Sequence, residues 1–271
     1  MSSPTRSARG VRVPPRGLRP SGLILLDKPA GPSSFQAIAA IRRCTGARTG
    51  HAGTLDPFAS GLLLVLSGAA TRLARFLVGL DKRYQTDVDL HARTSTGDVE
   101  GDVVEEATVP ALDEVEERLA GLRGEVDLPV PAASAVKIEG ERAYRLHRRG
   151  QTVEMPVRRS LVASLELLDY RDGVARLDLH VSSGTYVRSI ANALGGHCRT
   201  LRRLEVGPFS VDDADAERIL PAAEALPFFP AAEVSAEEAV AIRTGRRRAP
   251  EEVRTVCAGD LVAVGRVVMP A

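Results

Sequence analysis

The apolar residues of the chain recur with two different spacings, which predict a mixture of strands and helices. A continuous apolar run over residues 23–26 predicts a short buried strand that ends before Pro29, because proline cannot continue a central ladder. Strict alternation over residues 175–181 predicts a strand with one buried face. Apolar residues at helical spacing over 35–41 predict a helix that Ser33 or Ser34 caps.

The same patterns predict the remaining elements and the fold class. Further strands are expected at residues 62–66, 83–90, 134–138, 160–169, 253–257 and 261–268, and further helices at 71–78, 112–122, 141–149, 185–194 and 235–243. These elements do not follow a strict strand–helix–strand alternation. The expected fold is therefore mixed α+β, with a largely antiparallel sheet flanked by helices.

Composition divides the chain into three segments. Residues 1–20 contain five Arg, four Pro and no acid, so we expect a flexible basic arm that is either an RNA-binding arm or a dispensable leader, with an organellar transit peptide as a less favoured reading. Residues 21–221 are expected to form the main domain. An Ala- and Pro-rich stretch at 222–230 separates it from a small C-terminal appendage at 231–271.

The net charge of +1 hides a strong asymmetry along the chain. Residues 1–86 carry thirteen Lys or Arg against three acids, residues 87–131 carry three against thirteen, and residues 132–209 carry thirteen against eight. If the basic blocks share a face, they make a phosphate-binding surface, although ordinary solvated charge alone gives the same counts. No apolar run reaches the length of a membrane helix, and three scattered cysteines indicate a reducing cytoplasm.

The loop 49–61 is the segment whose residues point most directly to chemistry. It holds a single carboxylate, Asp56, between glycines and directly before Pro57. Glycines permit tight turns and close approach of the backbone, and such loops present reactive groups from a rigid scaffold. An Asp in a Gly- and Pro-containing loop is by itself more often a turn-former than a catalyst.

Seven stretches, in order, resemble the TruB family of tRNA pseudouridine-55 synthases. They are Gly22-Leu23-Ile24-Leu25-Leu26-Asp27-Lys28-Pro29, the Gly50 to Gly61 loop, Lys82-Arg83-Tyr84, Ser134-Ala135-Val136-Lys137, Arg142-Ala143-Tyr144, Gly184-Thr185-Tyr186-Val187-Arg188, and Leu201-Arg202-Arg203 with Val206-Gly207-Pro208-Phe209. The resemblance covers residues 22 to about 210. It implies a pseudouridine-synthase fold with a PUA-like RNA-binding region after it, which residues 231–271 would hold only in abbreviated form.

The resemblance assigns roles to single residues. Asp56 corresponds to the essential nucleophile of a reaction that needs no metal or cofactor, and Arg188 to the arginine that pairs with it. A cation in the first turn of a helix opposes the helix dipole, so a nearby anion is expected at Arg188 on physical grounds as well. Tyr84 corresponds to the aromatic residue that stacks on the flipped base. Further base- or substrate-binding residues are His51, Tyr186, Leu201, Lys28 and Lys137.

The expected partner is the T-stem and loop of tRNA, bound by a monomer without a guide RNA. The target uridine must leave its stack to reach a carboxylate, and phosphate contacts can offset that cost. The proposed phosphate partners are Arg42, Arg43, Arg48, Arg145, Arg148 and Arg149. Three alternatives remain: a non-catalytic tRNA-binding chaperone, a hydrolase with a carboxylate nucleophile, and a guide-RNA-dependent relative of the dyskerin type.

Overall fold

The computed structural model describes residues 21–151 and 153–270, so the arm at 1–20 lies outside the described residues. The chain forms two compact units, one made of residues up to Leu80 together with Glu205 onward, the other of Asp81–Leu204. The predicted limits at 21–221 and 231–271 describe a functional division, which these packing units do not test. Within the described residues, no helix is both long and apolar enough to cross a membrane.

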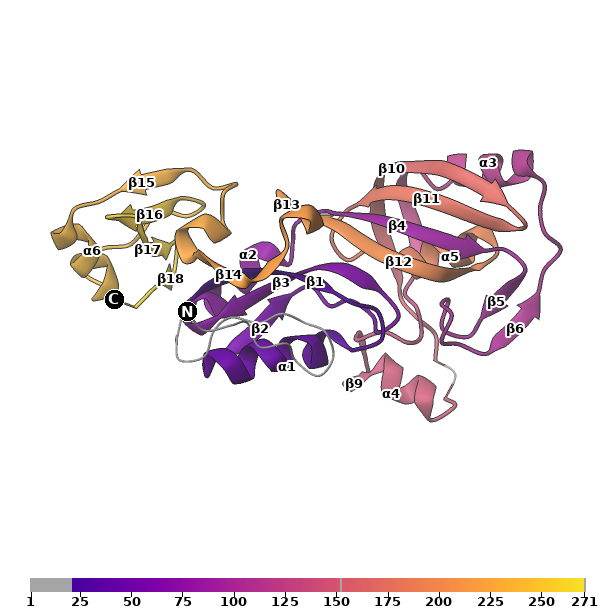
Figure 1. The fold of residues 1–271 in the computed structure, drawn as a ribbon, viewed down its shortest axis with the longest axis horizontal. Helices are drawn as coiled ribbons and strands as arrows, with labels where there is room; N and C mark the ends of the chain where they lie inside the picture. Colours follow the sequence, from indigo (N-terminus) through magenta and orange to yellow (C-terminus); the bar gives the residue numbers. More distant parts are fainter. Residues whose placement is uncertain (1–20, 152, 271) are drawn as a thin grey trace. The chain divides into compact units, whose positions relative to one another are not determined.

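The first unit is built on three antiparallel strands in the order β14-β1-β3, with β2 also paired to β3. These strands are β1 (Gly22–Lys28), β2 (Thr49–Ala52), β3 (Ser60–Ser67) and β14 (Asp215–Pro221). Every residue of 62–66 is fully buried, which explains why this strand is apolar without alternation. Helix α1 (Ser34–Thr45) packs on β2 and β3 (Figure 1).

Helix α1 begins as the sequence predicts. The Ser33 hydroxyl accepts from the amide of Gln36, whose side chain accepts from the Ser33 amide, which completes a capping box. Gly46 ends the helix in a left-handed conformation, φ 62°. Short helical segments complete this part of the unit: η1 (Gly68–Leu73), α2 (Ala74–Leu77), η2 (Val211–Asp213) and η3 (Ala222–Ala225), with the two-residue strand β13 (Phe209–Ser210).

The C-terminal residues of the first unit form a small sheet of their own, in the order β15-β16-β17-β18. Its elements are β15 (Ala231–Glu233), α6 (Ala236–Arg243), β16 (Arg254–Cys257), β17 (Asp260–Val264) and β18 (Val267–Val268). Ala239 and Ile242 of α6 pack on Val262 and Ala263. The Arg254 side chain fastens this sheet to the preceding segment, because it donates to the carbonyls of Phe229 and Ala223 at 2.8 and 2.7 Å.

The second unit is an antiparallel sheet in the order β12-β4-β11-β10-β7. Its long strands are β4 (Lys82–Asp89), β7 (Gly124–Pro129), β10 (Val157–Arg171), β11 (Val174–Val181) and β12 (His197–Val206). Helix α3 (Leu112–Ala120) packs on β10 and on α5 (Val187–Leu194). Smaller elements are β5 (Ala92–Thr94), β6 (Val103–Glu106), β8 (Lys137–Ile138), β9 (Glu141–Arg142) and α4 (Ala143–Arg148) (Figure 1).

Several predicted elements were wrong in extent or type. The strand expected at 134–138 exists only as Lys137–Ile138, and the helix expected from Glu141 begins at Ala143 after the two residues of β9. The helix expected at 71–78 is divided between a 3-10 turn and α2. The first four residues of the segment expected as the loop 49–61 form β2.

Candidate functional site

The Asp56 loop connects two neighbouring antiparallel strands, β2 and β3. The Asp56 side chain is half-buried, and the residues Leu55 and Ala59 on either side of it are buried. The Ala59 amide donates to the Asp56 carbonyl at 3.2 Å, so the chain turns directly after the carboxylate. Gly53 and Gly61 have φ values of 90° and 103°, a conformation that favours glycine, and they let the chain leave and re-enter the strands tightly.

The segment that leads into α1 holds this loop from both sides of Asp56. The Ser34 hydroxyl accepts from the Leu55 amide at 2.8 Å and donates to the Leu55 carbonyl at 2.9 Å. The Gly31 amide donates to the Pro57 carbonyl at 2.7 Å. The two residues that flank the carboxylate are therefore fixed by hydrogen bonds from one continuous stretch of chain.

Lys28 completes this arrangement from the end of β1. Its side chain is fully buried, and its ammonium group donates to the carbonyls of Pro29, Pro32 and Pro57 at 2.9, 2.8 and 3.3 Å. A buried ammonium group is tolerated where hydrogen-bond acceptors replace its water. The structure thus makes Lys28 a residue that holds the Asp56 loop, whereas its predicted contact with substrate stays a prediction.

Arg188 lies in the first turn of α5, where the sequence argument expected an anion near it. The side chain is only 2% exposed. One guanidinium nitrogen lies 3.2 Å from the Asp98 carboxylate and donates to the Thr96 carbonyl at 2.8 Å, and the other donates to the Ala133 carbonyl at 3.0 Å. Within this unit the anion beside Arg188 is Asp98, and the predicted pairing of Arg188 with Asp56 stays a prediction.

Asp98 is the residue of this site that the sequence interpretation missed. It is 3% exposed, and its second carboxylate oxygen accepts from the Thr96 hydroxyl at 2.6 Å and from the Glu100 amide at 3.0 Å. The Thr94 hydroxyl donates to the backbone carbonyl of Asp98 at 2.7 Å. The run Thr94-Ser95-Thr96-Gly97-Asp98 has the composition of an ordinary turn, so its only signal was a carboxylate surrounded by short hydroxyl side chains.

The predicted base-binding residues Tyr84, Tyr186 and Leu201 all belong to the second unit. Tyr84 is 8% exposed and lies on the buried side of β4, which it shares with Lys82 and Thr86. Tyr186 is half-buried at the N-cap of α5, and Leu201 is 7% exposed in β12, the strand next to β4. Their placement on one sheet and the adjoining helix start is compatible with a shared base-binding pocket.

Lys82 is a second buried lysine, with a different environment from Lys28. Its ammonium group lies 3.2 Å from the Ser183 hydroxyl, in the stretch that leads to Tyr186 and Arg188. Burial lowers the pKa of Lys82 to about 8; the positive charge of Arg203 acts in the same direction, and Asp81 opposes it. Two buried cations therefore belong to the same sheet as Tyr84: Lys82, on the same face of β4, and Arg203, in the neighbouring strand β12.

The basic residues predicted to contact phosphates lie in two groups. Arg42, Gly46, Ala47, Arg48 and Thr49 line a polar hollow of about 440 Å3 where α1 ends, and Arg43 is exposed on the same turn of the helix. In the segment β8–β9–α4, the guanidinium groups of Arg145 and Arg148 lie 5.9 and 5.7 Å from the ring centre of Tyr144. Lys137 is exposed in the same segment, and Arg149 pairs with Glu141 at 2.6 Å.

His51 lies in β2 opposite Val65 and is half-buried, so its side chain is presented by a strand and not by a loop.

Over the described ranges 21–151 and 153–270, no three His, Cys, Asp or Glu side chains gather as metal ligands would. The expected independence from metal and cofactor stays a prediction.

Comparison with known proteins relates this geometry to a family. Residues 42–187, more than half of the chain, match the family described as "TruB family pseudouridylate synthase (N terminal domain)". The chain is 41% identical over 261 residues to tRNA pseudouridine synthase B of Mycobacterium sp. (strain KMS), covering 88% of this chain and 87% of that protein. The chain belongs to the TruB family. It is accordingly a pseudouridine synthase, an isomerase of the RNA-modification class.

Further relatives agree with the assignment to the TruB family and with the fold. The protein of the same name from Leifsonia xyli subsp. xyli is 41% identical over 228 residues, covering 78% of this chain and 76% of that one. A chain from the crystal structure of a Cbf5-Nop10-Gar1 complex matches with a TM-score of 0.65 and 24% identity over 89% of this chain and 77% of that one. The predicted mixed α+β fold, with its largely antiparallel sheet and small PUA-like C-terminal part, is confirmed.

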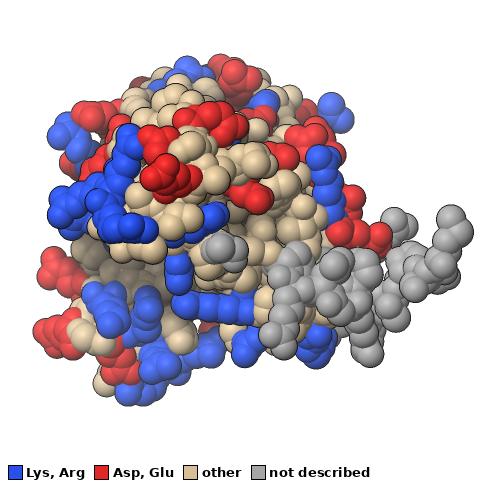
Figure 2. Space-filling view, turned by 90° about the vertical axis from the view of Figure 1, so that its left-hand side faces the viewer, with Lys and Arg blue, Asp and Glu red and all other residues tan. Residues whose placement is uncertain are grey.

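Charge on the C-terminal part of this TruB family member is concentrated around the end of α6. Arg243 closes the helix and is followed by exposed Arg246, Arg247 and Arg248, of which Arg247 pairs with Glu238. Figure 2 shows Lys and Arg side chains gathered in groups on one face, with Asp and Glu side chains between them. Such grouping is typical of surfaces that meet phosphates.

Proposed function

We propose that this TruB family member converts the uridine at position 55, in the T loop of tRNA, to pseudouridine, with Asp56 as the nucleophile. The observation that carries the proposal is the Asp56 loop, in which hydrogen bonds to Leu55 and Pro57 fix the backbone on both sides of one half-buried carboxylate. A nucleophile must be held close to its attack geometry, and a loop fixed in this way supplies that order before substrate binds.

The reaction is balanced without a co-reactant. The bond between C1′ and N1 of the uridine breaks, a bond between C1′ and C5 forms, C5 loses its proton and N1 gains one. Asp56 begins the reaction by attack at C6, by attack at C1′ or by deprotonation of the sugar in a glycal route, and it later serves as the proton acceptor from C5. The resemblance assigns Arg188 as the partner that keeps the carboxylate ionised. Its ion pair with Asp98 and the hydrogen bonds that it donates to the carbonyls of Thr96 and Ala133 would hold the guanidinium group in one orientation.

The remaining residues are proposed to bind the extruded nucleotide and its flanks. Tyr84 would stack on the base, with Tyr186 and Leu201 as walls of the pocket, and His51 would contact RNA beside the nucleotide. The exposed cations of the α1 end and of β8–β9–α4, including Lys137, would contact phosphates and offset the cost of unstacking. We further propose that the chain acts as a monomer in the cytoplasm, with no guide RNA, metal or cofactor.

The deciding experiment uses an unmodified tRNA transcript that is tritiated at C5 of its uridines. The purified chain, with no metal, cofactor or second RNA, should release tritium from one T-loop uridine, which is then located by mapping the product. Asp56→Asn should abolish release and leave tRNA affinity within about tenfold, because the carboxylate acts mainly on the transition state. Asp113→Asn, at an exposed position of α3, is the matched control and should keep full activity.

Other outcomes would reject the proposal in distinguishable ways. Tritium release that persists in Asp56→Asn would remove the nucleophile assignment. Binding of tRNA by the native chain without any release would favour the non-catalytic chaperone. Release that requires an added guide RNA would place the chain with guide-dependent enzymes instead.

A further inference from the structure

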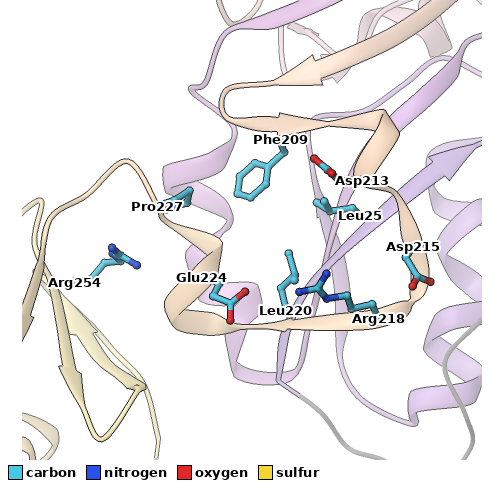
Figure 3. Close-up of a pocket in the computed structure, with 9 residues that line it drawn as sticks. All are labelled: Leu25, Phe209, Asp213, Asp215, Arg218, Leu220, Glu224, Pro227 and Arg254. Atoms are coloured by element: carbon cyan, nitrogen blue, oxygen red, sulfur yellow. The ribbon is translucent and has the colours of Figure 1, made fainter.

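A cavity of about 380 Å3 lies beside β14 in the first unit, and none of its lining residues belongs to the site described above. In Figure 3 the ring of Phe209 points into the cavity, and the side chains of Glu224 and Arg218 point toward each other across it. The full lining consists of Leu25, Phe209, Asp213, Asp215, Arg218, Leu220, Glu224, Pro227 and Arg254. The cavity therefore joins an apolar, partly aromatic floor to a charged rim.

A large bulge in β14 makes room for the cavity. Leu23 of β1 pairs with Leu220, but Leu25, two residues further along β1, pairs with Asp215. Six residues of β14, 215–220, thus lie opposite three of β1, 23–25, so β14 has three extra residues here. Bulges at sheet edges commonly re-aim side chains next to binding sites.

The charged rim of the cavity holds one more acid than it holds cations. Its acids are Asp213, Asp215 and Glu224, and its cations are Arg218 and Arg254. Glu217 lies in the bulge but outside the lining, and one of its carboxylate oxygens is buried with no hydrogen-bond partner among the described residues. The Arg254 guanidinium group is already used, since it donates to the carbonyls of Ala223 and Phe229. A ligand of this cavity should accordingly offer positive charge together with apolar surface.

The chain itself contains a segment with that chemistry, directly before β1. Residues 1–20 hold five Arg, four Pro and no acid. The described chain starts at Ser21, whose hydroxyl accepts from the Ala70 amide at 3.0 Å, and Gly22 pairs with Pro221, the neighbour of the lining residue Leu220. Six residues at about 3.1 Å each span roughly 19 Å, so residues 13–16 have enough chain to reach the cavity.

We propose that this cavity is a docking site for a proline- and arginine-containing peptide segment, and that its occupant is Val13-Pro14-Pro15-Arg16 of the same chain. Proline-rich segments bind aromatic-lined grooves at low entropic cost, and the carboxylates of Asp213, Asp215 and Glu224 complement the arginine. Docking would occupy arginines of the arm that could otherwise bind phosphates.

Limited proteolysis of the intact chain tests this docking without any RNA, so the result is independent of the proposed function. Trypsin cleavage after Arg12 and Arg16 is followed by mass spectrometry, and each initial rate is divided by the rate for a synthetic peptide of residues 1–20. We expect the intact chain to be cleaved at least about fivefold more slowly than the peptide, because a docked segment is shielded from the protease.

A triple variant, Asp213→Asn, Asp215→Asn and Glu224→Gln, should bring both rates close to those of the free peptide. These side chains are exposed, so the fold should be kept. The matched control, Asp260→Asn with Glu237→Gln and Glu251→Gln, removes the same charge from exposed positions of the C-terminal part and should leave the protection intact. Cleavage of the parent chain at the peptide's rate would overturn the proposal. So would equal rates in the parent and the triple variant, or an equal rise in the control.

Discussion

The Asp56 loop and the Arg188 pocket hold their charged groups by different physical means. The loop around Asp56 is fixed by hydrogen bonds to its backbone from Ser34, Gly31 and Lys28. Arg188 is fixed by a buried ion pair with Asp98 and by two carbonyls. The first arrangement acts on the backbone that carries the carboxylate, whereas the second makes the orientation of a cation depend on one opposite charge.

The largest loss of stability is expected from removing Asp98, the buried anion that holds Arg188. Asp98→Ala leaves the Arg188 guanidinium group in a buried site without its carboxylate within the second unit, which typically costs about 3–5 kcal/mol. The free energy of unfolding, measured by urea titration, should fall by that order, and activity should fall with it at temperatures where the chain is still folded. Glu100→Ala, two residues away, is the control and should change stability little. A stability loss no larger than that of the control would show that the Arg188–Asp98 ion pair does not stabilise the fold.

The next effect concerns the response of buried Lys82 to pH. Because the pKa of Lys82 is lowered to about 8 in the folded chain, the unfolded chain binds more protons between about pH 8 and 10.5. Stability relative to Lys82→Met should therefore rise with pH through this window, by roughly 3 kcal/mol at most. Urea titrations at pH 7 and pH 10 measure it, with exposed Lys137→Met as the control. A pH-independent difference would mean that Lys82 does not titrate there.

A smaller effect is expected from Lys28→Met, which keeps the length of the side chain and removes its three donors. Buried carbonyls without donors cost about 1–3 kcal/mol each in unfavourable cases, although loss of the buried charge offsets part of this. We expect a net loss of about 2 kcal/mol in the free energy of unfolding. We also expect a fall in kcat larger than the change in KM, because the substitution displaces the Asp56 loop more than it weakens substrate binding. An unchanged kcat would show that Lys28 does not determine the position of the Asp56 loop.

The smallest effect is expected from Ser34→Ala. It removes the hydroxyl that bonds both the amide and the carbonyl of Leu55, at a cost of about 1–2 kcal/mol. Hydrogen exchange of the Leu55 amide should become faster in the variant, and Ser33→Ala, which removes the helix cap instead, should leave that amide protected. Equal exchange of Leu55 in the parent and in Ser34→Ala would show that the loop is fixed by its other bonds.

The sequence predicted those elements whose residues follow a single rule. The apolar run of β3, the alternation of β11 and the helix cap at Ser33 or Ser34 each depend on local pattern, and each was confirmed, with Ser33 as the cap. Strand β12 was missed because arginines at 199, 202 and 203 interrupt any alternation, and one of them, Arg203, is fully buried. Strand β2 was missed because its Thr, Gly and His residues look like a loop and become a strand only by pairing with β3.

The candidate site shows the same division. The need for an anion near Arg188 could be argued from helix electrostatics, but its identity could not, because Asp98 is ninety residues away in sequence. The role of Lys28 was also beyond the sequence, since its acceptors are backbone carbonyls, which carry no signal in the side chains. The roles predicted for Asp56, Tyr84, Tyr186, Leu201, His51 and Lys137 stay predictions.

The pairing of β1 with β14 has a consequence for the newly made chain. Strand β1 begins the described residues, while its partner on one side, Asp215–Pro221, comes near the end of the sequence. At roughly 5–20 residues per second, the ribosome needs on the order of tens of seconds to make the chain between them. Until then one edge of β1 has no ladder to join, and an open apolar edge is where nascent chains pair wrongly. A strand that closes the sheet therefore also ends the period in which the growing protein most needs protection.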